Sequence, residues 1–266
     1  MIEDSNLMSL FFQVLASGSK GNSILVSSSK TRVLVDAGLS CKELVARLAK
    51  TPVEASRLNA LLITHEHSDH VNGAGTLSRR FDLPVYMTRG TLDNLNPKIA
   101  LNGVTVFETG KTFEIGDLKI MPFAISHDAA EPTGFIIENE GQRLGICTDL
   151  GVATNLVKLR LKDCHALVLE ANHDVDKLLN GPYPWVLKQR IKSPHGHLSN
   201  EEACELLEAV HHDELQCVVF AHLSETNNHP KLVQESFKRL RSRPCWEKVR
   251  FELGKQDDLA PGIEVK

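Results

Sequence analysis

Several features are scarce in this sequence of 266 residues, and each scarcity excludes a class of protein. Aromatic residues make up only 5% of the chain, so aliphatic side chains must fill the core. The six cysteines form no Cys-x-x-Cys pair, and Cys147, Cys164 and Cys217 lie in or beside apolar runs, where a reduced thiol behaves as a small hydrophobe. This pattern favours a reducing compartment over a disulfide framework.

Charge and hydropathy also limit the function. The formal net charge of −4 provides no overall attraction for nucleic acid or membranes, so any site for a polyanion must be local. No apolar run approaches the length of a membrane span. The first residues, Met1–Asp4, are acidic and lack the basic region of a signal peptide, and Met8 is an alternative start. We therefore expect a cytoplasmic protein with no membrane partner.

The most informative stretch is residues 64–70, which read Thr-His-Glu-His-Ser-Asp-His. Four potential metal ligands fall within six residues, namely His65, His67, Asp69 and His70. They follow an apolar run at 60–63 that predicts a buried strand, and they precede a predicted helix start at 71–77. Side chains alternate along a strand, so His65 and His67 point the same way. The motif predicts ligands for two metal ions; surface histidines in a polar loop are the alternative.

Acidic or histidine residues also stand at the ends of other predicted strands. They are Asp36, His127, Asp149, Glu170 and His222. Strands hold such end positions rigidly and can bring them together on one edge of a sheet sandwich. Strand ends are often polar because loops follow them, but this does not explain why these particular residues are all of metal-ligand type.

Apolar runs and turn residues predict a strand-rich first half followed by β/α units. The predicted strands cover 11–16, 23–28, 31–36, 60–63, 84–88, 103–107, 112–115, 118–126, 133–139, 142–148, 166–169 and 218–221. The predicted helices cover 40–50, with Ser40 as N-cap, 200–211, and 230–242, with Pro230 in the first turn. The chain has no repeat and no linker, which predicts one domain over 1–266 with two stacked sheets and helices outside.

We predict a two-metal site from these residues. One ion would take His65, His67 and His127; the other would take Asp69, His70 and His222; and Asp149 would bridge them. Nitrogen and carboxylate ligands suit zinc, manganese or iron. Two ions ~3.5–4 Å apart lower the pKa of bound water toward ~7 and hold both the nucleophile and the group attacked. Asp36 either caps a turn or orients a metal-bound histidine.

Through Asp36, the 64–70 motif, His127, Asp149 and His222, the chain resembles the metallo-β-lactamase superfamily. These motifs extend over about Val33 to Leu223. The resemblance implies an α/β fold of the αββα type, with two stacked mixed β-sheets flanked by helices. It also implies hydrolysis of esters, amides or phosphodiesters, without fixing the substrate.

Further stretches are similar to the YycJ/WalJ group of 5′-to-3′ exonucleases acting on DNA. They are residues 15–23, 169–174, 181–191, 195–203 and 221–228. The resemblance implies a nucleic-acid partner, DNA rather than RNA. The chain also resembles the tRNase Z enzymes, which carry a catalytic acid where Glu170 falls and a proton-donating histidine where His197 falls. Only about seventy residues separate Asp149 from His222, so we expect no inserted clamp domain.

The residues fit a hypothesis of phosphodiester hydrolysis. A metal-bound hydroxide would attack phosphorus in line, and His197, oriented by Glu170, would give a proton to the leaving 3′ oxygen. We count Asp69, Glu170 and His197 as catalytic. General acid help of this kind is typically worth ~10²–10⁴ in rate. The alternatives are a His197 that only precedes the helix starting at Asn200 and a Glu170 that is a structural strand-end acid.

Candidate substrate contacts lie in three places. The loop with Ser17, Ser19 and Asn22 offers hydroxyls, an amide and backbone N–H groups to an anion, although an ordinary glycine turn explains it equally well. Lys188 and Arg190 follow two aromatic rings that can stack on bases; a solvated helix face is the alternative. Asn227 and Asn228 either cap the next helix or touch substrate. A basic run at 238–243 can track a phosphate backbone or be solvated surface.

Two other functions compete with a nuclease. The first is small-molecule ester, thioester or lactone hydrolysis on the same metal centre, and the Glu170–His197 pair and the basic segments argue against it. The second is a non-enzymatic, metal-stabilised binding protein. The full ligand set argues against this reading, because a structural site need not keep a coordination position open for water.

Overall fold

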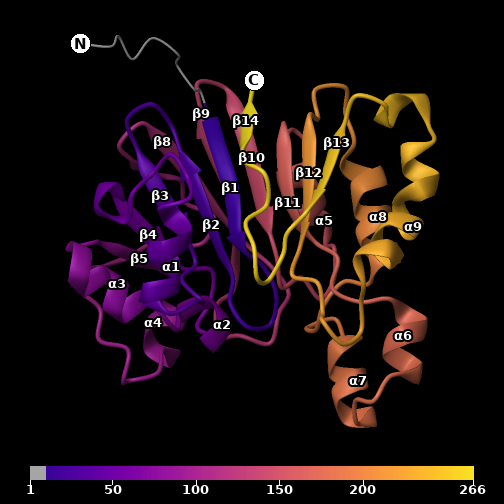
Figure 1. The fold of residues 1–266 in the computed structure, drawn as a ribbon, viewed down its shortest axis with the longest axis horizontal. Coiled ribbons are helices and arrows are strands. Elements are labelled where there is room, and N and C mark those ends of the chain that lie inside the picture. The colour runs from indigo at the N-terminus through magenta and orange to yellow at the C-terminus, as the bar shows by residue number, and fades with distance from the viewer. Residues whose placement is uncertain (1–9) are drawn as a thin grey trace.

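The computed structural model describes residues 10–266, so the acidic segment Met1–Asp4 and Met8 lie outside the described residues. Two seven-stranded mixed sheets stack face to face (Figure 1). In the first sheet the order is β14-β1-β2-β3-β4-β5-β6, and in the second it is β13-β12-β11-β10-β9-β8-β7. Helices cover the outer face of each sheet, which gives the four-layered αββα sandwich that the sequence predicted.

The strands fall close to their predicted positions. The first sheet contains β1 (Leu10–Ala16), β2 (Ser23–Ser27), β3 (Arg32–Val35), β4 (Ala60–Leu62), β5 (Val85–Met87), β6 (Val104–Val106) and β14 (Ile263–Val265). The second contains β7 (Phe113–Ile115), β8 (Leu118–Ala124), β9 (Thr133–Asn139), β10 (Gln142–Cys147), β11 (Ala166–Glu170), β12 (Cys217–Ala221) and β13 (Arg250–Leu253). The short strands β13 and β14, which each form one edge of a sheet, were not predicted.

Helices follow the strands on both sides of the sandwich. They are α1 (Cys41–Leu48), α2 (Ser68–Val71), α3 (Ala74–Phe81), α4 (Arg89–Asn94), α5 (Asn155–Leu161), α6 (Val175–Asn180), α7 (Trp185–Ile191), α8 (Asn200–Val210) and α9 (Pro230–Arg241). Ser40 caps α1 in a reciprocal capping box with Glu43, and Pro230 occupies the first turn of α9, both as predicted. The short helices α4 to α7 were not predicted as helices.

Three apolar layers hold the sandwich together. Aliphatic and phenylalanine side chains of both sheets, such as Phe12 and Phe135, form the layer between the sheets. Leu44 on α1 and Leu77 on α3 pack on the first sheet. Phe237 on α9 belongs to the layer that covers the second sheet. The scarcity of aromatic residues therefore results in a mainly aliphatic core, as expected.

Strand direction places the candidate ligands at one edge of the sandwich. In the first sheet β3 and β4 are parallel, and in the second sheet β10, β11 and β12 are parallel. The carboxyl ends of parallel strands meet at the same edge of a sheet. Asp149, Glu170 and His222 follow or end β10, β11 and β12, so the fold brings them side by side.

No helix in the part of the chain that the structure describes has the length and apolar character needed to cross a bilayer. The expectation of a single domain over residues 1–266 stays a prediction.

Candidate metal centre

The motif after β4 is fixed by backbone contacts to the loops after β1 and β3. Ala37 N donates to His70 O at 2.8 Å, and Asn22 N donates to Asp69 O at 2.8 Å. Gly38 lies so close to this turn that an added Cβ would sit 1.7 Å from Asp69 O. The short helix α2 therefore presents Asp69 and His70 from a defined position.

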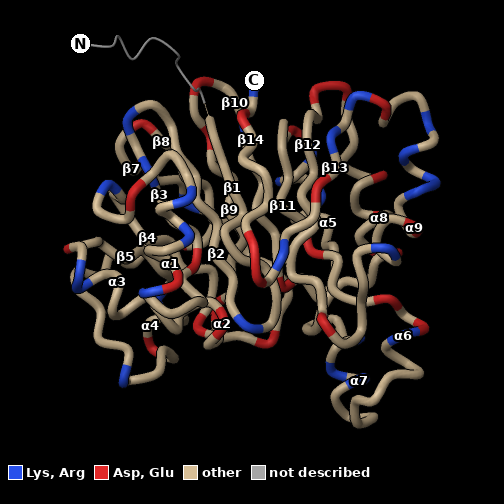
Figure 2. The backbone as a smooth tube through the Cα atoms, in the orientation of Figure 1, with Lys and Arg blue, Asp and Glu red and all other residues tan. Residues whose placement is uncertain are grey.

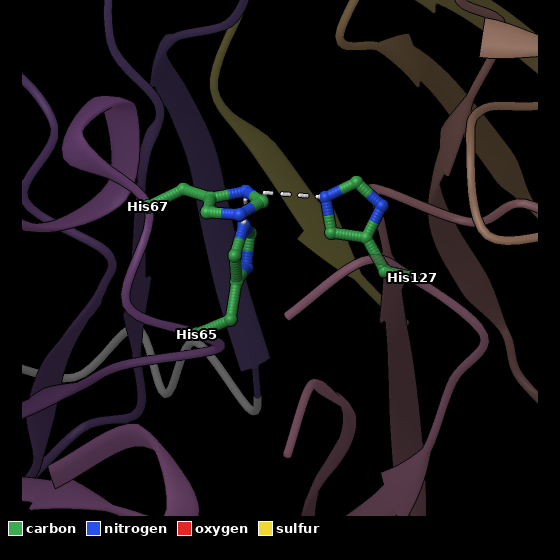
Figure 3. Close-up of side chains that lie close together, drawn as sticks. All are labelled: His65, His67 and His127. Atoms are coloured by element: carbon green, nitrogen blue, oxygen red, sulfur yellow. Dashed lines mark hydrogen bonds between the residues drawn. The ribbon is translucent and has the colours of Figure 1, made fainter. Parts of the chain in front are cut away.

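Three histidine rings meet where the two halves of the sandwich face each other. His65 Nε2 lies 3.1 Å from His67 Nδ1, and His127 Nε2 lies 3.3 Å from the same His67 atom. Figure 3 shows His65 and His67 coming from one side and His127 from the other, with their ring nitrogens turned toward one another. This triad is the ligand set that the sequence predicted for the first ion.

A second group lies directly beside this triad. Asp69, His70 and His222 place ligand atoms within 4.8 Å of one another, as predicted for the second ion. Asp69 Oδ2 is 3.6 Å from both His70 Nε2 and His222 Nε2. Asp149 lies between the groups, because its Oδ2 is 3.3 Å from His70 Nε2 and its Oδ1 is 3.7 Å from His127 Nε2. The arrangement suits two ions with a shared carboxylate.

In four of the histidines, an oxygen lies within hydrogen-bond distance of the ring atom Nδ1. Asp36 Oδ2 lies 2.8 Å from His70 Nδ1, and Glu170 Oε1 lies 2.8 Å from His222 Nδ1. Thr64 Oγ1 is 3.0 Å from His65 Nδ1, and Gly196 O is 3.2 Å from His127 Nδ1. Contacts of this kind fix the ring orientation and leave Nε2 free for a metal ion.

Asp36, for which the sequence left a turn cap or an orienting residue open, lies against His70, and its role there stays a prediction. Its buried carboxylate contacts His70 and also accepts from Thr64 N and Thr64 Oγ1, both at 2.9 Å. Asp36, Asp149 and His222 all have φ near +60°, a region that non-glycine residues seldom occupy. Such conformations cluster at functional sites, where the surrounding structure over-determines them.

The charges at the centre are paired in the absence of metal. Burial raises the pKa of the Asp149 carboxyl, but His222 and His70 outweigh it, so that this pKa lies well below its usual value. Burial lowers the pKa of His70. The charges of Asp149 and Asp36 outweigh burial, so that this pKa lies well above its usual value. Burial dominates at His65, where it lowers the pKa well below the usual value, helped by the neighbouring His70.

Two buried atoms at the centre have no hydrogen-bond partner among the described residues. They are Asp149 Oδ2 and His222 Nε2. A buried polar group without a partner costs about 1–3 kcal/mol. His222 belongs to the predicted second site, and Asp149 is the predicted bridging ligand. The residues present therefore fit two divalent cations, whose elements stay open among zinc, manganese and iron.

Glu170 is fully buried, and all its hydrogen-bonding positions are in use. Oε1 lies 2.9 Å from His197 Nδ1 and 2.8 Å from His222 Nδ1. Oε2 accepts from Leu150 N at 2.9 Å and from Leu198 N at 3.0 Å. A carboxylate offers about four lone-pair sites, so Glu170 has none left for a metal ion. It serves instead to hold the rings of two neighbouring histidines, His197 and His222.

The predicted substrate residues have varied surroundings. Ser17 Oγ accepts from His222 N, and Asn22 Nδ2 lies 3.3 Å from Asp69 Oδ2, so both support the metal centre. Ser19 is exposed and lines a cavity beside His197. Their contact with a substrate stays a prediction.

The other predicted contacts are mostly engaged inside the protein. Lys188 is buried, and its Nζ donates to two backbone oxygens, Leu179 O and Gly181 O, at 2.7 Å. Arg190 pairs with Asp128 at the rim of the cavity. Asn228 Nδ2 donates to Ala171 O at 2.8 Å, and Asn227 is fully buried. These placements provide structural roles for Lys188 and Asn228, and a contact of any of these residues with substrate stays a prediction.

The basic run on α9 lies away from the centre. Figure 2 shows its blue segments at the right edge of the molecule, far from α2. Arg239 and Arg243 face Glu208, and Lys238 pairs with Glu235. The local excess of positive charge is therefore partly neutralised within the fold.

The fold and the His/Asp cluster define a metal-dependent hydrolase. The beta-lactamase superfamily domain model matches residues 31–222, and the chain belongs to the metallo-β-lactamase superfamily. The exodeoxyribonuclease YycJ of Bacillus anthracis is 40% identical over 232 residues, which cover 86% of this chain and 88% of that protein. The exodeoxyribonuclease WalJ of Streptococcus pneumoniae is 38% identical over 222 residues, 82% of each chain.

Solved structures agree on the fold. The metallo-β-lactamase fold protein YhfI of Bacillus subtilis superposes with a TM-score of 0.72 at 16% identity, over 95% of this chain and 99% of that one. The short form of human tRNase Z superposes with a TM-score of 0.62 at 15% identity, over 96% and 99%. At this identity the similarity establishes the fold alone.

Replacing Asp36 with asparagine is expected to weaken metal binding about 10–100-fold, because His70 loses the carboxylate that fixes its ring. Asparagine tolerates the positive φ at this position. A chelator competition measures the affinity, with Asp82→Asn as matched control, since Asp82 is exposed and has φ +51°. Unchanged affinity in Asp36→Asn would show that Asp36 only caps the turn.

Proposed function

We propose that this protein is a dinuclear metal-dependent 5′-to-3′ exodeoxyribonuclease that acts as a single domain, without an inserted clamp, in the cytoplasm. The observation that carries the proposal is the Glu170–His197 pair beside the two ligand groups, in a chain 38–40% identical to relatives named exodeoxyribonucleases. The compartment is supported by the six cysteines, Cys41, Cys147, Cys164, Cys204, Cys217 and Cys245, all of which are free.

The ligand groups would hold the two ions as their geometry suggests. His65, His67 and His127 would hold one; Asp69, His70 and His222 would hold the other; and Asp149 would be shared. When bound, such a pair supplies an acidic water near neutral pH and positive charge for the phosphate oxygens. Asp69 is only partly exposed. Burial raises its pKa, but His222 and His70 outweigh burial, so that the pKa is lowered and Asp69 remains a carboxylate.

Glu170 prepares His197 to give up a proton. Burial raises the pKa of Glu170, but His197 and His222 outweigh burial and lower this pKa to about 2. Glu170 therefore stays ionised at neutral pH. The Nδ1 proton is held by Glu170, whereas Nε2 makes no hydrogen bond within the described residues.

The proton on His197 Nε2 is the one that the reaction needs. When the bond between phosphorus and the 3′ oxygen breaks, this oxygen leaves with the electron pair and takes the Nε2 proton. His197 stays held by Glu170 through Nδ1 and takes up a new proton from solvent. General acid catalysis of this kind contributes ~10²–10⁴ in rate.

Hydrolysis of a small ester, thioester or lactone is the alternative function on the same ligand set. Carbonyl hydrolysis of an activated ester releases a stable alcohol or thiol and gains less from a strong proton donor. A buried carboxylate that holds His197 as well as His222 therefore favours a poor leaving group such as a 3′ alkoxide. A non-enzymatic metal-stabilised protein is disfavoured because the ligand Asp69, and His197 beside the ligands, are both partly exposed.

A direct test compares substrates. Single- and double-stranded DNA labelled at the 5′ end is incubated with the protein and added Mn²⁺ or Zn²⁺, alongside a thioester and a lactone. We expect the wild type to release label from DNA and the His67→Ala variant to release at least ~10²-fold less, because the first ligand triad is broken. Thioester turnover without DNA cleavage under any metal would overturn the nuclease.

A further inference from the structure

A cavity of about 290 Å³ opens beside the metal centre. His197 and Gly196 line it, together with Leu187 and Ile191 of α7. Tyr183, from the turn between α6 and α7, completes the wall. In Figure 1 these two short helices project below the second sheet, on the side of the sandwich where α2 also lies.

The cavity is lined by apolar and by polar side chains, among them the Asp128–Arg190 ion pair. Tyr183, Leu187 and Ile191 provide an aromatic and aliphatic surface. Asn172 and Ser224 also line the cavity, are largely buried and keep hydrogen-bonding capacity. The Asn172 amide donates to His222 O, which leaves its oxygen available, and the Ser224 Oγ accepts from Asn227 N, which leaves its hydroxyl proton available. One flat apolar group with polar groups on one edge fits such a space.

The place of His197 identifies the occupant, on the basis of the proposed function. His197 lines the cavity and also lies beside Asp149 and Glu170 at the metal centre, so a nucleotide in the cavity lies on the His197 side of the cleaved bond. In 5′-to-3′ digestion the leaving unit is the terminal nucleotide. The cavity is the space that adjoins His197 there, and the remaining DNA extends away from it across the metal centre.

The volume limits what can enter. Small-molecule sites span ~300–1,000 Å³, so this cavity lies at the lower end and cannot hold a base pair. A terminal base must therefore leave its partner before it enters, as in enzymes that extrude a base from the duplex.

We propose that this cavity binds the unpaired 5′-terminal nucleotide with its base against Tyr183, and that it sets the length of the released product to one nucleotide. Tyr183 is then a specificity-determining residue, because stacking on an aromatic ring accepts every base. The same site accounts for exonuclease action on a fold whose metal centre alone distinguishes no end. Paired ends are cleaved more slowly than single-stranded ends, since fraying precedes entry.

The test uses deoxyadenosine 5′-monophosphate and the metal-loaded protein in a calorimetric titration. Tyr183→Ala is expected to bind the mononucleotide about 5–150-fold more weakly than the wild type, the range for loss of one stacked base. Tyr183→Phe keeps the ring and should bind within about twofold. Val186→Ala is the matched control on α7, because Val186 is 77% exposed and does not line the cavity.

A second arm identifies the first product from single-stranded DNA labelled at the 5′ end. A labelled mononucleotide is expected. Equal mononucleotide binding by wild type and Tyr183→Ala would overturn the proposal, as would a first product of two or more nucleotides. If the mononucleotide binds through Tyr183 but no DNA is cleaved, the exonuclease function fails while the nucleotide site stands.

Discussion

Replacing His197 with glutamine is expected to leave both metal sites filled and to slow DNA cleavage about 10²–10⁴-fold. The reason is geometric. Glu170 Oε1 holds His197 Nδ1 at 2.9 Å, so Nε2 is the nitrogen left to carry the proton. Glutamine can keep a contact with Glu170, but it cannot deliver a proton to a leaving alkoxide. Metal content by mass spectrometry and kcat on single-stranded DNA measure the two effects separately.

A substrate with an acidic leaving group makes this test specific. The p-nitrophenyl ester of thymidine 5′-monophosphate releases a phenolate that needs no proton, so the variant should lose much less of its rate on this ester than on DNA. His195→Gln is the matched control, since His195 is exposed and lies in the same loop. Equal losses on both substrates would contradict proton donation.

Loss of metal in the His197 variant would lead to a different conclusion. Asp149, Glu170, His197 and His222 bring four ligand-type atoms within 4.8 Å, so they form a competing metal cluster. The four contacts already made by the Glu170 carboxylate argue against that use. A variant that binds fewer ions would make His197 a ligand.

Replacing Asp149 with alanine is expected to abolish activity and to leave the protein with fewer than two ions. Asp149 is the carboxylate shared by the two ligand groups, within 3.7 Å of His70, His127 and His222. Without it both groups lose a ligand, and the buried histidines lose their counter-charge. The number of bound ions per chain checks the result, and Asp163→Ala, at an exposed position, is the control.

Proton release provides an independent measure of the same site. Burial lowers the pKa of His222. Asp149, Asp69 and Glu170 outweigh burial, so that this pKa lies well above its usual value of 6.5. The His70 pKa is raised in the same way. In the metal-free protein these protonated histidines stabilise the fold fully below pH 6.5, and that contribution is lost as pH rises through the raised values.

Metal ions must displace these protons, because only a neutral imidazole binds a metal. Metal uptake near pH 7 is therefore expected to release protons, and the apparent affinity is expected to rise with pH. In Asp149→Ala the His70 pKa loses its strongest raising charge, so fewer protons should be released per ion. Equal proton release by wild type and variant, followed with an indicator dye, would contradict this account.

The sequence was most informative where the chemistry is local. His65, His67, Asp69 and His70 lie within six consecutive residues, and their spacing alone predicts that they share a site. The strand-end positions Asp149 and His222 were also accessible, because an apolar run that ends in a ligand-type residue can be recognised without a structure. Their meeting follows from parallel strand order, which the sequence only suggested.

Residues whose environment is set by tertiary packing were harder to interpret. Lys188 was predicted as a charge for substrate, yet α7 buries it against backbone oxygens near α6. Ser17, predicted in an anion loop, accepts a hydrogen bond from His222 N, 205 residues away. Thr64, which contacts Asp36 and His65, was not singled out because a threonine after a strand carries no distinctive pattern.

We expect two ions where the ends of the two sheets meet. Anomalous scattering from crystals grown with Mn²⁺ or Zn²⁺ locates them. Two peaks about 3.5–4 Å apart are expected. One peak lies among His65, His67 and His127, the other lies among Asp69, His70 and His222, and Asp149 reaches both. A single peak, or a peak bound by Glu170 and His197, would contradict it.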